Sequence, residues 1–218
     1  MPQKTGHKSK DGKNLFYNLE QRVVQKYVDK VPKWLETYHL TLLTILWTAG
    51  ILIFSYLARN NINWLWLSSL IIFLQYVTDM FDGAVGRHRN TGLVLWGFYM
   101  DHLLDYFFIS AVIIGYAMIF PAQYHFTFFF ILAVIGAFSA HTHLAFGATQ
   151  QFNISFGRIG PTEARLGCII LNTLIIFLGT ATLEIALPYV LGIGMIIVFL
   201  AVLKEQKKIW KLDMDNKK

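Results

Sequence analysis

The stretch from Asp79 to Asp105 reads DMFDGAVGRHRNTGLVLWGFYMDHLLD and carries four aspartates within an otherwise largely apolar part of the chain. The acids stand in two pairs, Asp79 with Asp82 and Asp101 with Asp105. On helices, spacings of i,i+3 and i,i+4 place the members of each pair on one face. An ionised carboxylate in a low-dielectric setting is costly unless something compensates its charge. Four of them together therefore predict a function.

The residues around the acids indicate which function. Unpaired, four carboxylates held by two facing helix ends would repel one another. One or two divalent cations would turn them into an all-oxygen site that suits Mg²⁺ or Mn²⁺, which commonly also bind substrate phosphates. Gly83 and Gly86 let a ligand approach the backbone, and Arg87 offers a guanidinium to a phosphate. The stretch predicts a site for metal and diphosphate. The structural alternatives are a helix break at the glycines and pairing of the acids with Arg87 and Arg89.

The composition places these acids in a membrane protein. The chain has 218 residues, of which 55% are hydrophobic, and its mean hydropathy is +0.47. Its apolar runs lie at 40–58, 62–80, 92–120, 125–149, 167–182 and 185–203. Five of them hold 19 or more residues, about the length that crosses a hydrocarbon core of about 30 Å at about 1.5 Å per residue, and the fifth run, 167–182, is the shortest. We therefore expect an all-α fold, a bundle of six transmembrane helices in one domain.

The basic residues predict how this bundle is oriented. With six spans, every Lys and Arg except Arg59 falls on one side of the membrane. The positive-inside rule then places both termini and the loop with Arg87 and Arg89 in the cytoplasm. The net charge of +6 is explained by this topology and by contact with anionic lipid, not by nucleic-acid binding.

The chain divides into four parts. Residues 1–13 are polar and basic, which predicts a disordered N-terminus without a secretory signal. In residues 14–36, Leu15, Leu19 and Val23 recur every four positions among basic residues, which predicts a juxtamembrane amphipathic helix in the interface. We expect residues 37–204 to form the six-helix transmembrane domain, the catalytic part if the protein is an enzyme, and residues 205–218 to form a basic cytoplasmic tail. The lone Cys168 excludes an intrachain disulfide.

The acidic stretch resembles the signature of the CDP-alcohol phosphotransferases, also called the CDP-alcohol phosphatidyltransferase family, which reads D-x2-D-G-x2-A-R-x8-G-x3-D-x3-D. The matching positions are Asp79, Asp82, Gly83, Arg87, Gly97, Asp101 and Asp105. Gly86 takes the place of the usual alanine, and one extra residue separates Arg87 from Gly97. Because the spacing from Gly97 to Asp105 is kept, we place the extra residue in a loop around His88 to Thr91.

The resemblance implies an enzyme that transfers a substituted phosphoryl group from a CDP-alcohol to an acceptor hydroxyl and releases CMP. The donor would be CDP-diacylglycerol or a CDP-choline or CDP-ethanolamine type, and the acceptor a lipid or a small polar alcohol. The resemblance also implies a homodimer and a general base at Asp105. Two Mg²⁺ or Mn²⁺ ions would be held by Asp79, Asp82, Asp101 and Asp105, and the CDP-alcohol would be bound by Asp79, Gly83, Gly86, Arg87 and Gly97.

A second polar stretch, GRIGPTEARLG at 157–167, adds two further candidates. Pro161 followed by Glu163 is typical of a helix start. Arg158 and Arg165 are candidates to bind a phosphate of the acceptor or of the lipid substrate; the alternative is non-specific contact with lipid headgroups. His102 gives the second acid pair a DHxxD pattern, similar to the branch that moves phosphocholine or phosphoethanolamine onto diacylglycerol.

Two other readings of the acids remain open. A cation-coupled or proton-coupled transporter also uses intramembrane carboxylates. Against it, these acids lie at the ends of spans and come with a glycine- and arginine-containing stretch. A non-catalytic member of the family, suggested by the altered loop length, is the other; the presence of all four acids argues against it.

Overall fold

The computed structural model describes residues 16–91, 93–149 and 160–216, and these form helices without any strand. The long helices are α2 (Thr37–Ala58), α3 (Leu65–Arg89), α4 (Val94–Ile119), α5 (His125–Thr149), α6 (Pro161–Leu178) and α8 (Leu187–Asn216). The short elements are α1 (Tyr17–Tyr27), α7 (Ala181–Glu184) and the 3-10 turns η1 (Val28–Lys30), η2 (Ile62–Trp64) and η3 (Ala122–Tyr124). Six helical stretches in the described ranges are long and apolar enough to cross a membrane. The predicted all-α, six-helix class is confirmed.

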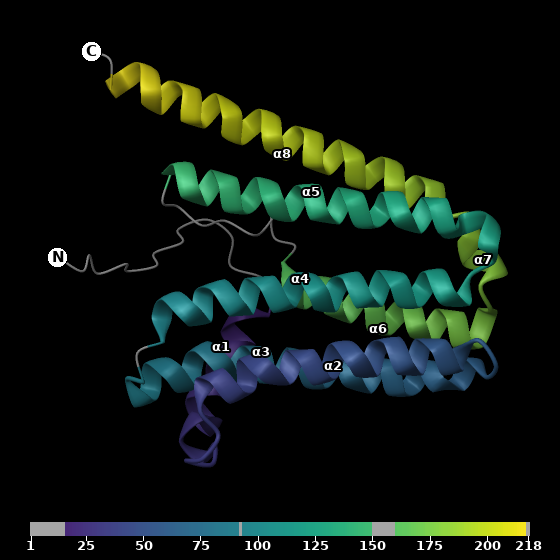
Figure 1. The fold of residues 1–218 in the computed structure, drawn as a ribbon, viewed down its shortest axis with the longest axis horizontal. Coiled ribbons are helices and arrows are strands. Elements are labelled where there is room, and N and C mark those ends of the chain that lie inside the picture. Colours follow the sequence, from purple (N-terminus) through teal and green to yellow (C-terminus); the bar gives the residue numbers. More distant parts are fainter. Residues whose placement is uncertain (1–15, 92, 150–159, 217–218) are drawn as a thin grey trace.

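The long helices lie side by side, as Figure 1 shows, with α8 at the outer edge next to α5. Helix α2 packs against both α3 and α4, and α6 packs against α3. The buried side chains at these contacts include Ile51, Ile72, Phe108 and Ile175. In contrast, only 6% of the most apolar window of the last span is buried, against 33% in the spans of α3 and α4. The acids therefore lie on the helices with the most buried surface.

Small and polar residues hold the acid-bearing helices together. A Cβ at Gly115 of α4 would collide with Ser55 of α2, so glycine permits this close crossing of two helices. Asn172 of α6 donates from Nδ2 to Oγ of Ser69 on α3 at 3.0 Å and accepts from the hydroxyl of Tyr116 on α4 at 2.9 Å. Because buried polar groups are stable only when hydrogen-bonded, this amide fixes α6 against both α3 and α4.

The segment before α2 is anchored to the end of α3. Val28 packs in a small apolar cluster with Ala84 and Val85 of α3. The guanidinium of Arg89 donates to the backbone carbonyls of Val31 at 2.8 Å and of Leu35 at 2.7 Å. These contacts hold α1 and η1 against the half of α3 that carries Asp79 and Asp82.

The helix bounds differ from the predicted spans in three places. Helix α3 continues to Arg89 and ends at Asn90, which has a φ of 55°; His88 and Arg89 are therefore helical and do not belong to the loop. Helix α6 begins before the apolar run at 167, at Pro161, where the helix-start pattern predicted it: Pro161 takes the first helical position and Glu163 accepts from the backbone N–H of Gly160 at 2.8 Å. Helix α8 continues to Asn216, so most of the predicted tail is helical.

Candidate functional site

Three of the four aspartates converge between α3 and α4. Asp79 of α3 and Asp101 and Asp105 of α4 each offer a carboxylate oxygen, and these oxygens lie within 4.8 Å of one another. Asp101 and Asp105 are one helical turn apart, so they share the face of α4 that meets Asp79. Like charges at such distances disfavour one another unless a cation lies among them. The spacing of these three oxygens is compatible with a bound metal ion.

Arg165 supplies a positive charge to this group from α6. Its Nη1 donates to Oδ2 of Asp79 at 2.9 Å, and its Nη2 donates to Oδ1 of Asp105 at 3.1 Å. The side chain of Arg165 is only 11% exposed, so solvent screens these ion pairs little. The planar guanidinium can engage two carboxylates at once, which a lysine ammonium does with less directional precision. The other arginine candidate, Arg158, lies outside the described residues.

Gln75 is a site residue that the sequence reasoning missed. It lies one turn before Asp79 on α3, is fully buried, and donates from Nε2 to Oδ1 of Asp105 at 3.0 Å. Two donors, Gln75 and Arg165, therefore meet the same oxygen of Asp105. The sequence feature that could have identified Gln75 is a side-chain amide inside an apolar span, four residues before Asp79.

Asp82 faces a different neighbour from Asp79. Its Oδ1 accepts from the hydroxyl of Thr37, and its Oδ2 accepts from the hydroxyl of Thr41 at 2.5 Å. Both threonines belong to the first turns of α2, and the side chain of Asp82 is buried there. Its predicted role as a metal ligand stays a prediction. The threonines, spaced i,i+4 at the start of an apolar span, were not recognised as partners.

The predicted CDP-alcohol residues lie mostly along one face of α3. Asp79, Gly83 and Arg87 follow one another at four-residue intervals, and α3 runs through the glycines without a break. A Cβ at Gly83 would lie 3.0 Å from Nη1 of Arg87, so glycine leaves room for this guanidinium beside the helix. A Cβ at Gly86 would instead lie 3.2 Å from Oγ1 of Thr37, so Gly86 permits close packing against α2. Gly97 lies in the first turn of α4, with no neighbouring atom in the described structure near the position of its missing Cβ.

A cavity of about 330 Å³ opens on the acidic group between α3, α4, α5 and α6. Asp79, Asp101, Asp105 and Arg165 line its polar part. The rest of the lining is mainly apolar and includes Phe108, Val112, Ile135 and Phe138. His102 and His143 also line it, with ring centroids 5.6 Å apart. The cavity thus extends from the acid-bearing helices to α5 and α6, and its lining is mainly apolar.

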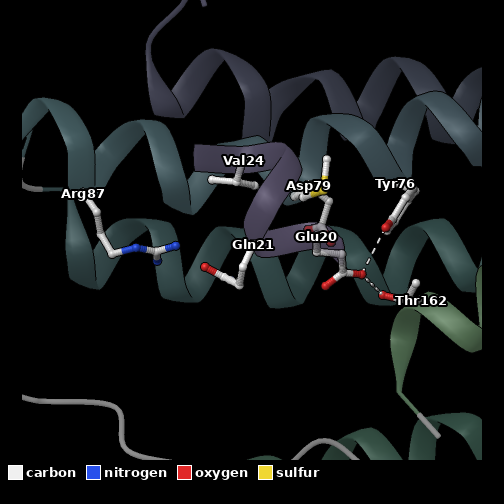
Figure 2. A pocket seen from close by; sticks show the side chains of 8 residues that line it. Glu20, Gln21, Val24, Tyr76, Asp79, Arg87 and Thr162 are labelled. Carbon is white, nitrogen blue, oxygen red and sulfur yellow. Dashed lines mark hydrogen bonds between the residues drawn. The ribbon is translucent and has the colours of Figure 1, made fainter. Parts of the chain in front are cut away.

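A smaller cavity of about 120 Å³ lies on the other side of Asp79, under α1. Figure 2 shows its lining, with Glu20 and Gln21 of α1 facing Tyr76 and Arg87 of α3. Oε1 of Glu20 accepts from the hydroxyl of Tyr76 at 3.0 Å and from the hydroxyl of Thr162 at 2.8 Å. No sequence pattern singled out Glu20, because it is one acid in a segment whose pattern is otherwise basic and apolar. Asp79 lines both cavities.

Comparison with known protein families agrees with this geometry. The sequence model for CDP-alcohol phosphatidyltransferases matches residues 37–208, well over half of the chain. The chain belongs to the CDP-alcohol phosphatidyltransferase family. This is a transferase family, and the recognition made from the acidic stretch is confirmed. Comparisons with curated proteins and with solved structures found no significant match.

CDP-alcohol phosphatidyltransferases use a divalent metal, and the residues of this chain fit one. The converging donors of Asp79, Asp101 and Asp105 are all carboxylate oxygens, the ligands that Mg²⁺ and Mn²⁺ prefer. Oε1 of Gln75 is buried beside them without a hydrogen-bond partner in the described residues, which leaves a further oxygen for the site. The transporter hypothesis has no such support, because the matched family consists of transferases.

Proposed function

We propose that this membrane protein transfers a substituted phosphoryl group from a CDP-alcohol to an acceptor alcohol and releases CMP in phospholipid biosynthesis. The observation that carries the proposal is the group of Asp79, Asp101, Asp105 and Arg165 at the polar end of a largely apolar cavity. A diphosphate needs concentrated positive charge, whereas a lipid body needs an apolar enclosure. Divalent ions held by the three acids would supply that charge, directly beside the apolar lining of the cavity.

The acidic residues would hold the divalent ions, Mg²⁺ or Mn²⁺. Asp79, Asp101 and Asp105 supply the converging oxygens, and we keep Asp82 as a further ligand through rotation of its side chain away from Thr37 and Thr41. When bound, the metal neutralises the diphosphate and the charge that develops on the leaving CMP. Arg87, lying over Gly83, would bind the donor phosphates, and Arg165 a phosphate of the acceptor or of the lipid substrate.

Asp105 is our candidate for the general base. The acceptor hydroxyl oxygen forms a bond to the donor phosphorus that carries the alcohol, while the bond from that phosphorus to the CMP oxygen breaks. The hydroxyl proton passes to Asp105. Gln75 and Arg165 both donate to Oδ1 of this residue. They therefore fix the orientation of the carboxylate, so Oδ2 is the oxygen to which we assign the proton.

The apolar lining supports a lipid as one of the two substrates. CDP-diacylglycerol with a small polar alcohol, and CDP-choline or CDP-ethanolamine with diacylglycerol, both place a lipid body beside the acids. Purified protein in vesicles, given each radiolabelled donor with a panel of acceptors, tests the proposal through CMP release and the lipid product. Absence of CMP with every donor and acceptor would refute it.

Turnover is expected to require Mg²⁺ or Mn²⁺. Excess EDTA should abolish CMP release, because Arg165 alone cannot balance the three carboxylates and an added diphosphate. Readdition of Mg²⁺ above the EDTA concentration should restore the rate. Full turnover in EDTA would exclude the metal assignment, whereas ion flux without CMP would favour a transporter.

We also propose that the site and both termini face the cytoplasm and that the enzyme acts as a homodimer. The orientation rests on the distribution of Lys and Arg, of which only Arg59 follows a span on the other side. In a Cys168→Ala background, a cysteine introduced at His88 should react with an impermeant maleimide only after the cells are opened. A cysteine at Asn60 should react in intact cells. The reverse pattern would overturn this orientation.

A further inference from the structure

The α1 cavity, lined by Glu20, Gln21, Tyr76, Asp79, Arg87 and Thr162, has one wall that lies outside the residues matched by the family model. The family match begins at residue 37, whereas Glu20 and Gln21 belong to α1. The cavity nevertheless adjoins the reaction centre, because Asp79 lines it and also belongs to the acidic group. Helix α1 therefore adds a specific surface to the shared catalytic core.

Glu20 brings to this cavity a negative charge that has no counter-ion among the residues that the structure describes. Its Oε1 accepts from the neutral hydroxyls of Tyr76 and Thr162, which orient the carboxylate but leave its charge in place. Within residues 16–91, 93–149 and 160–216, the ion pairs of the molecule join other residues and none includes Glu20. Asp79, by contrast, has Arg165. A partly buried carboxylate of this kind favours a cationic ligand.

The layout and size of the cavity limit what that ligand is. In Figure 2 the guanidinium of Arg87 lies at one end of the lining and the carboxylate of Glu20 toward the other, with Gln21 between them. A phosphate beside Arg87 would thus leave the next few atoms of the ligand near Glu20. The cavity's volume of about 120 Å³, against about 330 Å³ for the larger cavity, favours a short aminoalkyl group over a nucleoside.

We propose that the α1 cavity binds the ammonium end of a small amino alcohol, with Glu20 as its counter-ion. The inference rests on the proposed function and narrows its substrate. This ammonium group could belong to a free acceptor such as serine or to the headgroup of a donor such as CDP-ethanolamine. Tyr76 contributes a ring beside the ammonium, where a cation–π contact adds to the attraction of the carboxylate.

The test compares substrates with and without an ammonium group on wild-type protein and on Glu20→Gln. One assay arm combines CDP-diacylglycerol with serine, one combines CDP-ethanolamine with diacylglycerol, and one combines CDP-diacylglycerol with glycerol phosphate. We expect CMP in one of the first two arms, which also identifies the source of the ammonium group. Glu20→Gln should raise KM for that ammonium substrate about tenfold to hundredfold, as expected for loss of a charged hydrogen-bond partner, while kcat stays within a few-fold.

Two variants separate recognition from anchoring of α1. Asp29→Asn removes an exposed acid of the same segment that pairs with His88 outside the cavity, and should leave KM unchanged. Tyr76→Phe removes a hydroxyl that donates to Glu20 but keeps the carboxylate charge, and should raise KM far less than Glu20→Gln. An equal rise in both would mean that Glu20 only anchors α1, which overturns the proposal. So would CMP formation in the glycerol phosphate arm alone, whereas no CMP in any arm would refute the proposed function itself.

Discussion

Asp105→Asn is expected to reduce kcat by about 10²–10⁴-fold, the range for loss of a general base. The amide keeps the size of the side chain and can still accept from Gln75 and Arg165, whose donors lie 3.0 Å and 3.1 Å from Oδ1. It cannot take the acceptor proton. Binding of the CDP-alcohol should remain largely intact because Asp79, Asp101 and Arg87 are unchanged. The measurements are kcat at saturating acceptor and donor affinity by calorimetry.

Asp82→Asn provides the contrast to this variant. Its carboxylate is held by Thr37 and Thr41 and is our further metal ligand. The amide should weaken binding of metal and donor together, which raises KM before it lowers kcat. Glu205→Gln, which removes an acid paired with Lys208 on α8, is the control for folding and detergent effects. Near-normal kcat in Asp105→Asn would refute its role as base, and a loss well beyond the stated range would make Asp105 an essential metal ligand.

Arg165→Met is expected to impair both stability and catalysis. Without the guanidinium, Asp79 and Asp105 lose ion pairs at 2.9 Å and 3.1 Å, and the protein should be destabilised by about 3 kcal/mol in EDTA. Mg²⁺ should recover part of this loss because it supplies positive charge to the same carboxylates. At saturating Mg²⁺, kcat should still fall about 10²–10³-fold, as for loss of one preorganised donor to developing charge.

The matched controls for Arg165 separate charge from geometry. Arg165→Lys keeps the charge but not the planar fork, so it should restore stability more than activity. Arg22→Gln removes an exposed cation from α1 and should change neither. Stability is measured by thermal unfolding in detergent, with EDTA or with Mg²⁺, and activity is measured by CMP release. Equal melting temperatures of Arg165→Met and wild type in EDTA would contradict the counter-ion role of Arg165.

The spacing of the aspartates correctly predicted a shared face for Asp101 and Asp105, but not the different neighbours of Asp79 and Asp82. Residues four apart on a helix differ in direction by about 40°, so Asp101 and Asp105 share a face wherever α4 lies. Residues three apart differ by about 60°. That difference allows Asp79 to face α4 and α6 while Asp82 faces Thr37 and Thr41 of α2. The sequence alone could not reveal which helix lies on each side of α3.

The partners of the acids were harder to predict because they come from distant parts of the chain. Arg165 reaches Asp79 from a helix that begins beyond residue 160, and no periodicity connects the two. Glu20 meets Thr162 only because α1 folds back over the start of α6. The C-terminal ends of α3 and α8 were missed for a simpler reason. A span predicted from hydropathy ends where charged residues begin, whereas the backbone hydrogen bonds of α3 continue through Arg87 to Arg89.

The unbroken helix α3 fixes the directions of several site side chains relative to one another. Gln75, Asp79, Gly83 and Arg87 stand at every fourth position of one uninterrupted helix. A single residue inserted among them would turn everything beyond it by about 100° and point Arg87 away from Asp79. The residue that this chain has in excess of the family signature follows Arg87, close to where Asn90 ends the helix with a φ of 55°. The number of residues after Asn90 can vary without changing the directions of the side chains on α3. Asn90 therefore separates the part of the signature that needs a fixed helical spacing from a part whose length can vary.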